Sequence, residues 1–487
     1  MMKKNIICLS GLTAFFLASC LTGCQRKDQL DPNNPVTISV LTYYNGAQQI
    51  AFDELVKEFN KTIGAKKGIF VEASTSGDLT ELSSTLDFEL SKDAAQRELP
   101  DIFSCYATTA YSFDKEGLLA NLNEYFSEEE LAEYIDAYIE EGKVGTDDAL
   151  LFLPVAKSTE VMTLNKTDWE PFAQETGITP DDLTTWEGVT ASAQKYYEWT
   201  DAQTPAPNDG KAMFGRDAIS NFIIAGTHQL GFDLFEVDSN RKATVTMNED
   251  ALRKIWDNYY VPYISGYFTS TGRFASDDMK TGNIILMVGS SSGATYVPTE
   301  VTVDDEEPYA IETVTMAVPD FAGCSSIAIQ QGAGMTISKS DSLHEKASAE
   351  FLKWFTDTDA NTRFTIVSSY LPVKKEANSM EAIEKAAQDN SLALNKTTKD
   401  SIEVSLEECS SRELVTSQVF DNSGSCRTII NDALLDKAAE DREAVKNLIS
   451  ANGGTLKEAV AQYDTNENFS DWYQTLKTKL EETVILD

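Results

Sequence analysis

The sequence predicts an α/β protein built from two lobes, each with a mostly parallel sheet and helices on both of its faces. The first observation is length, because 487 residues are about three times the usual size of a single domain. The second is composition, since 42% hydrophobic residues and only 13 prolines supply a large core and exclude a disordered chain. The third is a regular alternation of strand-like and helix-like segments from residue 36 onward.

The first part of the chain shows this alternation most clearly. Predicted strands are 36–41, 68–71 and 100–103, and predicted helices, recognised by apolar residues at helical spacing, are 52–63 and 80–90. Sheets of this kind bind ligands beyond the carboxyl ends of their strands. We therefore expect Tyr43, Tyr44, Asn45, the segment 74–78 and Tyr106 at one rim.

A second series of elements starts near residue 151. Thr184 to Glu187 fits a capping box, and Trp186 is expected on the buried face of the helix that follows. Further predictions are strands at 284–288 and 314–319, a helix at about 343–356, and mostly helical structure in the last hundred residues. The strand at 284–288 runs into Gly289-Ser290-Ser291-Ser292-Gly293, whose small residues suit an anion if a helix begins there.

The N-terminus has the pattern of an export signal. Lys3 and Lys4 precede an uncharged apolar run that is too short to span a membrane comfortably. Leu21-Thr22-Gly23-Cys24 resembles a bacterial lipobox, so we expect residues 1–23 to be removed and the Cys24 thiol to accept the lipid. Residues 24–35 are polar and contain proline, as a tether does. We expect the protein to be held at the cell membrane by this lipid alone, facing the extracellular or periplasmic side.

Charge and residue counts exclude several classes of function. The net charge of −38 repels phosphate backbones, so nucleic acid is not an expected partner. The chain has only two histidines, His228 and His344, and no metal site or cofactor is predicted. Four cysteines follow the leader, at positions 105, 324, 409 and 426, without redox or metal spacing. A bridge between Cys409 and Cys426 is one interpretation, and buried free thiols are the other.

Several segments occur in an order found in one known family. They are Pro100-Asp101-Ile102-Phe103, Leu153-Pro154, Val161 to Lys166, Ala349 to Phe355, and Ser369-Tyr370-Leu371-Pro372-Val373. In this order they resemble the extracellular solute-binding proteins, family 1, of ABC importers, which include maltose- and glycerol-phosphate-binding members. The resemblance runs from Val36 to about Ala377.

The resemblance implies a type II periplasmic-binding-protein-like fold, in which two lobes joined by crossovers close on a ligand in the cleft between them. It implies an N-terminal lobe of 36–155 with 326–375, and a C-terminal lobe of 156–325 with 376–487. It further implies a monomer that is not an enzyme. Such a protein hands an unaltered small solute to the transmembrane permease subunits of an importer.

A carbohydrate, either an oligosaccharide or a monosaccharide, is the solute that we expect, because carbohydrate binders form the larger part of the class. Sugars present hydroxyl groups to polar side chains and C–H faces to aromatic rings. The candidate aromatic platforms are Tyr43, Tyr44, Tyr106, Tyr296 and Tyr370, and the candidate polar contacts are Asn45, Asp78, Glu160 and Gln331.

Two alternatives remain open. The first is glycerol phosphate or another phosphorylated polyol; in members that bind it, the serine-rich turn and the Gln331-Gly332 loop approach the ligand. The corresponding candidates here are Ser290, Ser291, Ser292, Gln331 and Gly332, with Lys157 and Arg427 as cations. The second is a secreted esterase, because Gly289 to Gly293 also fits Gly-x-Ser-x-Gly with Ser291 as nucleophile. Its triad would need His344, which we expect in an exposed first helical turn instead.

Overall fold

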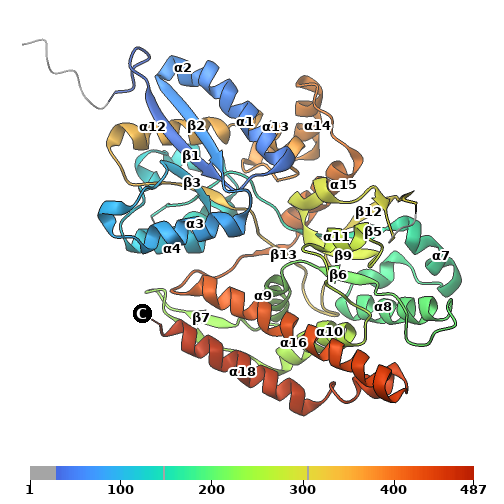
Figure 1. Ribbon diagram of the computed structural model, residues 1–487. Helices are drawn as coiled ribbons and strands as arrows, with labels where there is room; N and C mark the ends of the chain where they lie inside the picture. The colour runs from blue at the N-terminus through green and yellow to red at the C-terminus, as the bar shows by residue number, and fades with distance from the viewer. Residues whose placement is uncertain (1–28, 146–148, 304–306, 487) are drawn as a thin grey trace, which may run out of the picture.

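The computed structural model describes residues 29–145, 149–303 and 307–486, and Figure 1 shows its arrangement. The leader, Cys24 and part of the tether lie outside the described residues. Two groups of strands, each with its own helices, occupy the upper left and the lower right of the view. The predicted two-lobed α/β architecture is confirmed. In the described ranges no helix has the length and apolar character that crossing a bilayer requires.

The sheet of the first lobe has the strand order β2-β1-β3-β14-β4. Its strands are β1 (Val36–Thr42), β2 (Ile69–Thr75), β3 (Ile102–Cys105), β4 (Leu153–Pro154) and β14 (Gly334–Ile337). In β1 the alternate residues Val36, Ile38 and Val40 are buried, because successive side chains of a strand point to opposite faces. β1 runs parallel to β2 and β3, whereas β14 is antiparallel to β3 and β4.

Helices cover this sheet. They are α1 (Gly46–Lys61), α2 (Ile63–Lys67), α3 (Leu79–Ser91), α4 (Ala107–Lys115), α5 (Glu128–Leu131), α6 (Asp136–Gly142), α12 (Ser342–Phe355) and α13 (Thr358–Ser368). α1 buries Phe52, Leu55 and Phe59, which recur at helical spacing as predicted. Phe52 meets Phe355 of α12 edge-on, with 5.2 Å between ring centroids. The apolar periodicity therefore attaches α1 to the first lobe.

The sheet of the second lobe has the order β12-β5-β9-β6. Its strands are β5 (Glu160–Asn165), β6 (Phe214–Arg216), β9 (Leu286–Ser290) and β12 (Thr313–Met316). β6 and β9 are parallel, but β5 is antiparallel to both of its neighbours. Each sheet thus has one strand that opposes the rest. β5 and β14 enter their sheets directly from a crossover rather than through a β-α-β unit, which alone requires parallel strands.

The second lobe carries the remaining long helices. They are α7 (Lys166–Thr176), α8 (Trp186–Asp201), α9 (Ile219–Gln229), α10 (Glu249–Ile264), α11 (Ala275–Lys280), α16 (Ser423–Asn452), α17 (Leu456–Val460) and α18 (Asn466–Val484). α14 (Met380–Asp389) and α15 (Lys396–Ser411) precede α16, so the predicted helical end of the chain is confirmed. Short strand pairs complete the fold: β7 (Phe235–Val237) with β8 (Ala243–Val245), β10 (Glu300–Val301) with β11 (Tyr309–Ala310), and β13 (Ile327–Ile329) with β15 (Glu413–Val415).

The start of α8 differs from its prediction by one residue. Thr185, not Thr184, caps the helix, and its hydroxyl accepts a hydrogen bond from the Gly188 backbone N–H at 3.1 Å. No capping box forms, because the residue three positions after this cap is Gly188, which has no side chain; the Glu187 carboxylate instead accepts a bond from the backbone of Ala322. Trp186 is buried in the second core, as predicted.

Separate apolar cores support the two lobes. The first core combines residues between 36 and 156 with residues between 333 and 373, and the second combines residues between 162 and 321 with residues between 420 and 480. A small third core lies around α14 and α15. Cys409 packs on this third core and Cys426 lies in the second, so the bridge between them is not formed and both are free thiols. Cys105 and Cys324 are also free.

Three crossover segments lie side by side between the lobes. They are 155–159 between β4 and β5, 330–333 between β13 and β14, and 369–374 after α13. The backbones of Lys157 and Leu371 exchange two hydrogen bonds, at 3.1 and 2.6 Å, and those of Ser158 and Gln331 exchange two, at 3.0 and 2.8 Å. These bonds join the three segments into one hinge.

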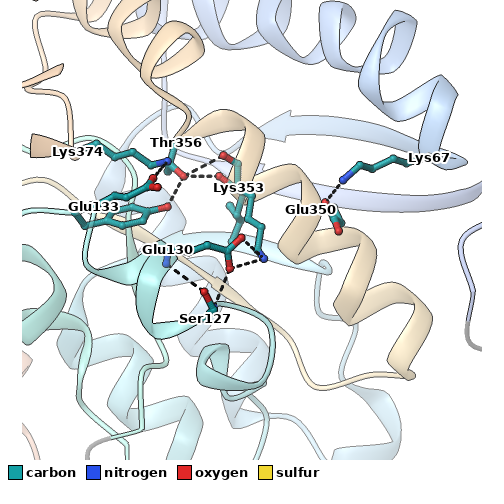
Figure 2. A network of polar contacts seen from close by, with 10 residues as sticks. Lys67, Ser127, Glu130, Glu133, Glu350, Lys353, Thr356 and Lys374 are labelled. Atoms are coloured by element: carbon teal, nitrogen blue, oxygen red, sulfur yellow. Dashed lines mark hydrogen bonds and ion pairs between the residues drawn. The ribbon is translucent and has the colours of Figure 1, made fainter. Parts of the chain in front are cut away.

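A polar network anchors the third crossover to the first lobe (Figure 2). Lys374 pairs with Glu133 at 2.8 Å, and the hydroxyls of Tyr134 and Thr356 lie 2.5 Å apart. Beside them, Lys353 of α12 contacts both carboxylate oxygens of Glu130, at 2.6 and 2.7 Å. After the hinge residue Leu371, the chain is thus fixed at Lys374 to the loop after α5, and Tyr134 of that loop is bonded to Thr356 at the end of α12.

Candidate functional site

A cavity of about 650 Å³ lies between the lobes and against the crossovers. Its volume falls within the range of about 300–1,000 Å³ typical of sites for small molecules. Ten of the predicted site residues line it: Tyr43, Asn45, Asp78, Tyr106, Ser290, Ser292, Tyr296, Gln331, Gly332 and Tyr370. The rule that ligands bind beyond the carboxyl ends of strands therefore located the cavity correctly. We call it the cleft.

Two tyrosines form the floor of the cleft. The hydroxyls of Tyr43 and Tyr370 lie 2.8 Å apart, and both residues are buried. Burial raises the pKa of Tyr370 to about 12, so its hydroxyl stays a neutral donor and acceptor at physiological pH. Tyr44 does not line the cleft, contrary to prediction. Its ring packs against Phe52 and Phe364 in the first core.

Two direct contacts join the lobes across the cleft. The Tyr296 hydroxyl donates to Asn45 Oδ1 at 2.7 Å, and Arg273 pairs with Asp78 at 2.6 Å. Asp78 also caps α3 by accepting a bond from the Glu81 backbone. This backbone bond, followed by the bond from Arg273, lowers the pKa of the Asp78 carboxyl. These contacts hold the lobes in a closed arrangement.

Aromatic side chains from both lobes present free surface to the cleft. Tyr106 follows β3 in the first lobe and is 39% exposed, while Phe274 and Tyr296 of the second lobe are each 50% exposed. These rings offer flat apolar surface to the cleft from both lobes.

The serine-rich turn divides between cleft and core. Ser290 and Ser292 line the cleft, with their hydroxyls 3.0 Å apart. Ser291 is fully buried, and its hydroxyl accepts a bond from the Thr159 backbone at 3.2 Å. Residues 291–296 form a short 3-10 turn rather than the α-helix that the anion-site interpretation required. Ser291 therefore does not line the cleft, and its hydroxyl is not accessible as a nucleophile.

His344, the histidine that an esterase triad with Ser291 would need, does not lie near the serine-rich turn. His344 lies near the start of α12 in the first lobe, and its ring bonds to Asp341 at 2.8 Å. Asp341 is the N-cap of that helix, so His344 lies in the first helical turn, as the sequence predicted. The structure does not assemble Ser291 and His344 into a catalytic site.

Two predicted polar contacts are buried beside the cleft instead of lining it. Lys157 is fully buried, and its ammonium group contacts Glu141 at 2.5 Å and the Gly332 carbonyl at 2.9 Å. Glu160 is buried with Arg216, at 2.9 Å, and Asn221, at 2.8 Å. Both side chains have buried protein partners and do not line the cleft.

Arg427 lies outside the cleft, next to a smaller cavity of about 160 Å³. Tyr106 and Gln331 line both cavities, so the two adjoin. The guanidinium donates to Ser417 at 3.0 Å and to Asn221 at 2.5 Å, and both acceptors are neutral. Burial lowers the pKa of Arg427.

Sequence reasoning missed many residues of the cleft, among them Asp217, Arg273 and Phe274. Asp217 follows β6 directly, and the rule used for the first lobe would have found it. β6 has only three residues and no alternation, so its end was not recognised. Arg273 and Phe274 belong to the loop before α11, where no pattern indicates a site.

Asp217 gives a prediction for the pH dependence of stability. Its Oδ1 accepts a bond from the Ala275 backbone at 2.9 Å, and burial raises the pKa of the carboxyl from 3.8 to about 6. The unfolded chain loses this proton near pH 4 and the folded chain only near pH 6, so stability falls as pH rises through this window. We expect Asp217→Asn, measured against wild type by urea unfolding, to gain about 2–3 kcal/mol between pH 4 and pH 7. A difference that does not change with pH would contradict this assignment.

The cleft between two α/β lobes, with a hinge of three crossovers, defines a protein that encloses a small molecule by lobe closure. Residues 54–390 match the family model of bacterial extracellular solute-binding proteins. This match covers more than half of the chain. The chain belongs to the bacterial extracellular solute-binding proteins. A search of curated proteins finds no match.

Solved structures of similar fold support the type II solute-binding architecture. The cyclic α-maltosyl-1,6-maltose binding protein from Arthrobacter globiformis is 17% identical, with a TM-score of 0.62 over 92% of this chain and 100% of that chain. UgpB from Mycobacterium tuberculosis, in complex with glycerophosphocholine, is 18% identical, with a TM-score of 0.64 over 93% and 100%. Lmo0181 from Listeria monocytogenes, in complex with cycloalternan, is 16% identical, with a TM-score of 0.63 over 91% and 99%.

Proposed function

We propose that this chain is the lipid-anchored solute-binding component of an ABC importer and that it captures a neutral carbohydrate in the cleft. Cys24 carries the anchor, and closure of the lobes presents the loaded form to the membrane permease. The ligand contacts both lobes only when they are shut, so its binding shifts the population to the closed form. The aromatic surfaces that face the cleft from both lobes are the observation that carries this proposal.

The charges around the cleft favour a neutral solute. Asp78, Asp217 and Asp277 line it, against two cations, Arg273 and Lys280. Arg273 is already paired with Asp78, so the cleft has no surplus of positive charge for a phosphate. Carboxylates, serine hydroxyls and the Gln331 amide instead match the hydroxyl groups of a sugar.

A thermal-shift screen tests the ligand class. The panel contains neutral oligosaccharides, monosaccharides and polyol phosphates. We expect a neutral glycan to raise the melting temperature, because a ligand at 100 times its dissociation constant adds about 2.7 kcal/mol of stability. A response confined to phosphate esters would reject the carbohydrate and support the second candidate below.

Removing one aromatic surface should weaken binding of the glycan found in that screen. We expect Tyr296→Ala to lower its affinity about 10- to 100-fold by calorimetry, because the ring is a large contact surface in the cleft. Tyr296→Phe keeps the ring and removes only the bond to Asn45, so it separates stacking from lobe contact. Phe232→Ala is the matched control, since that ring is 44% exposed outside the cleft. Equal effects of Tyr296→Ala and Phe232→Ala would refute the role of Tyr296.

A phosphorylated polyol is the second candidate because of Arg427. Among the described residues this guanidinium donates hydrogen bonds to neutral acceptors, and it lies at the smaller cavity that adjoins the cleft. A partly buried cation whose hydrogen-bond acceptors are neutral would be stabilised by the phosphate of a ligand that extends from the cleft. The polyol phosphates in the panel test this candidate directly.

A further inference from the structure

The second lobe has an open hollow of about 880 Å³ on the side of α16, formed apart from the floor of the cleft. Its wall combines the C-terminal ends of α10 and α11 with the middle of α16 and the segment before β6. Four basic residues line it, Lys211, Lys280, Arg442 and Lys446, against one acidic residue, Glu443. In the whole chain, acidic residues outnumber basic ones by 78 to 40. Basic residues therefore outnumber acidic ones in the hollow, whereas acidic residues outnumber basic ones over the whole chain.

Most of this positive charge is not neutralised within the described part of the chain. Lys446 pairs with Glu443 at 2.6 Å, but no ion pair there involves Lys211, Lys280 or Arg442. Side chains of Thr269, Thr271 and Asn283 add neutral hydrogen-bonding groups to the same wall. Cations together with hydroxyl and amide groups are suited to an anion with several oxygen atoms.

Arg442 is held on the wall by the backbone around it. Its guanidinium donates to the Ile264 carbonyl at the end of α10, at 3.0 Å. It also lies so close to Gly266 that a Cβ there would come within 2.2 Å of a guanidinium nitrogen. Gly266 has φ of +80°, a conformation that glycine adopts without strain. The bend after α10 thus leaves room for a cation in a fixed position.

We propose that this hollow binds a soluble ligand with two or more phosphate groups, at a site that adjoins the cleft only through Lys280, which lines both cavities. The cations of the hollow come from separate segments of the chain. Each can contact a different phosphate group, so a ligand with several phosphates suits the hollow better than a ligand with one. The repulsion between an anionic ligand and the net charge of −38 is screened beyond about 8 Å at physiological ionic strength. The cations within the hollow therefore determine whether an anion binds there. A flat bilayer surface does not fit, because the hollow is concave and Arg442 is only partly accessible.

Charge reversal at two exposed lysines tests the site, with tripolyphosphate as the ligand. We expect saturable binding by calorimetry at physiological salt, weakened about tenfold in the double variant Lys211→Glu with Lys446→Glu. Lys385→Glu with Lys396→Glu is the matched control, because these lysines are exposed on α14 and α15 and the net charge changes equally. The control should retain affinity within about twofold.

Three results would overturn the proposal. They are no saturable binding to wild type, an equal loss in both double variants, or binding to phosphatidylglycerol vesicles through these lysines without binding of tripolyphosphate. The thermal shift given by a neutral glycan reports on the cleft and on folding in the same samples. The two sites are therefore tested independently, and failure of one leaves the result for the other intact.

Discussion

Gly332→Ala is expected to lower the free energy of unfolding by about 4 kcal/mol. Gly332 has φ of +93°, and for a residue with a side chain this conformation costs about 1–2 kcal/mol. A Cβ there would lie 2.3 Å from the Ala156 carbonyl oxygen and 2.8 Å from Lys157 Cα. Both atoms belong to the backbone of the neighbouring crossover, so relief of the overlap requires the hinge to move, at a further cost of about 1–3 kcal/mol.

Gly117→Ala separates the two contributions. Gly117 also has positive φ, +68°, but nothing lies within 4 Å of the position that its Cβ would take. We expect this control to lose about 1–2 kcal/mol in urea unfolding, from the backbone conformation alone. Equal losses for the two variants would show that the crossovers tolerate the extra atom, and that the hinge is looser than its hydrogen bonds indicate.

Lys157→Met is expected to destabilise the protein by about 3–5 kcal/mol, because it leaves a buried carboxylate without its cation. Lys157 is fully buried and Glu141 nearly so, at 0% and 7% side-chain exposure. Glu141 would keep only the bond from the Gln330 amide, at 2.5 Å. The same substitution also removes the bond to the Gly332 carbonyl, which joins two crossovers.

A double-mutant cycle with Glu141→Gln tests this explanation by chemical denaturation. The double variant removes the uncompensated charge, so we expect it to recover most of the stability lost in Lys157→Met. Lys385→Met, which breaks the exposed pair with Asp389, is the control and should cost less than about 1 kcal/mol. If Lys157→Met lost no more than this control, the buried pair would have no special role in the hinge.

The fold was largely predictable because its signals are local. Alternation in β1 and helical spacing in α1 each report a buried face within a few residues. The reversed strands β5 and β14 were not predictable in the same way. The direction of each of these strands depends on where the chain enters the sheet after it crosses between the lobes. No short stretch of sequence contains that information.

The site was predictable at the level of segments but not of single side chains. Tyr43 faces the cleft while its neighbour Tyr44 packs in the core, and Ser291 is buried between two serines that line the cleft. Adjacent residues in extended or tightly turned backbone point in different directions, so a run of one residue type cannot face one ligand. Lys157 and Glu160 were misassigned because their partners, Glu141 and Arg216, are distant in sequence.

The position of β14 has a consequence for how the chain acquires its structure. This strand lies between β3 and β4, and in the described residues β4 pairs with no other strand. The ribosome makes β14 only after most of the second lobe, so the first sheet stays incomplete until late in synthesis. Such long-range closure slows folding. A nascent chain that is slow to close is well suited to threading through an export channel before it becomes compact.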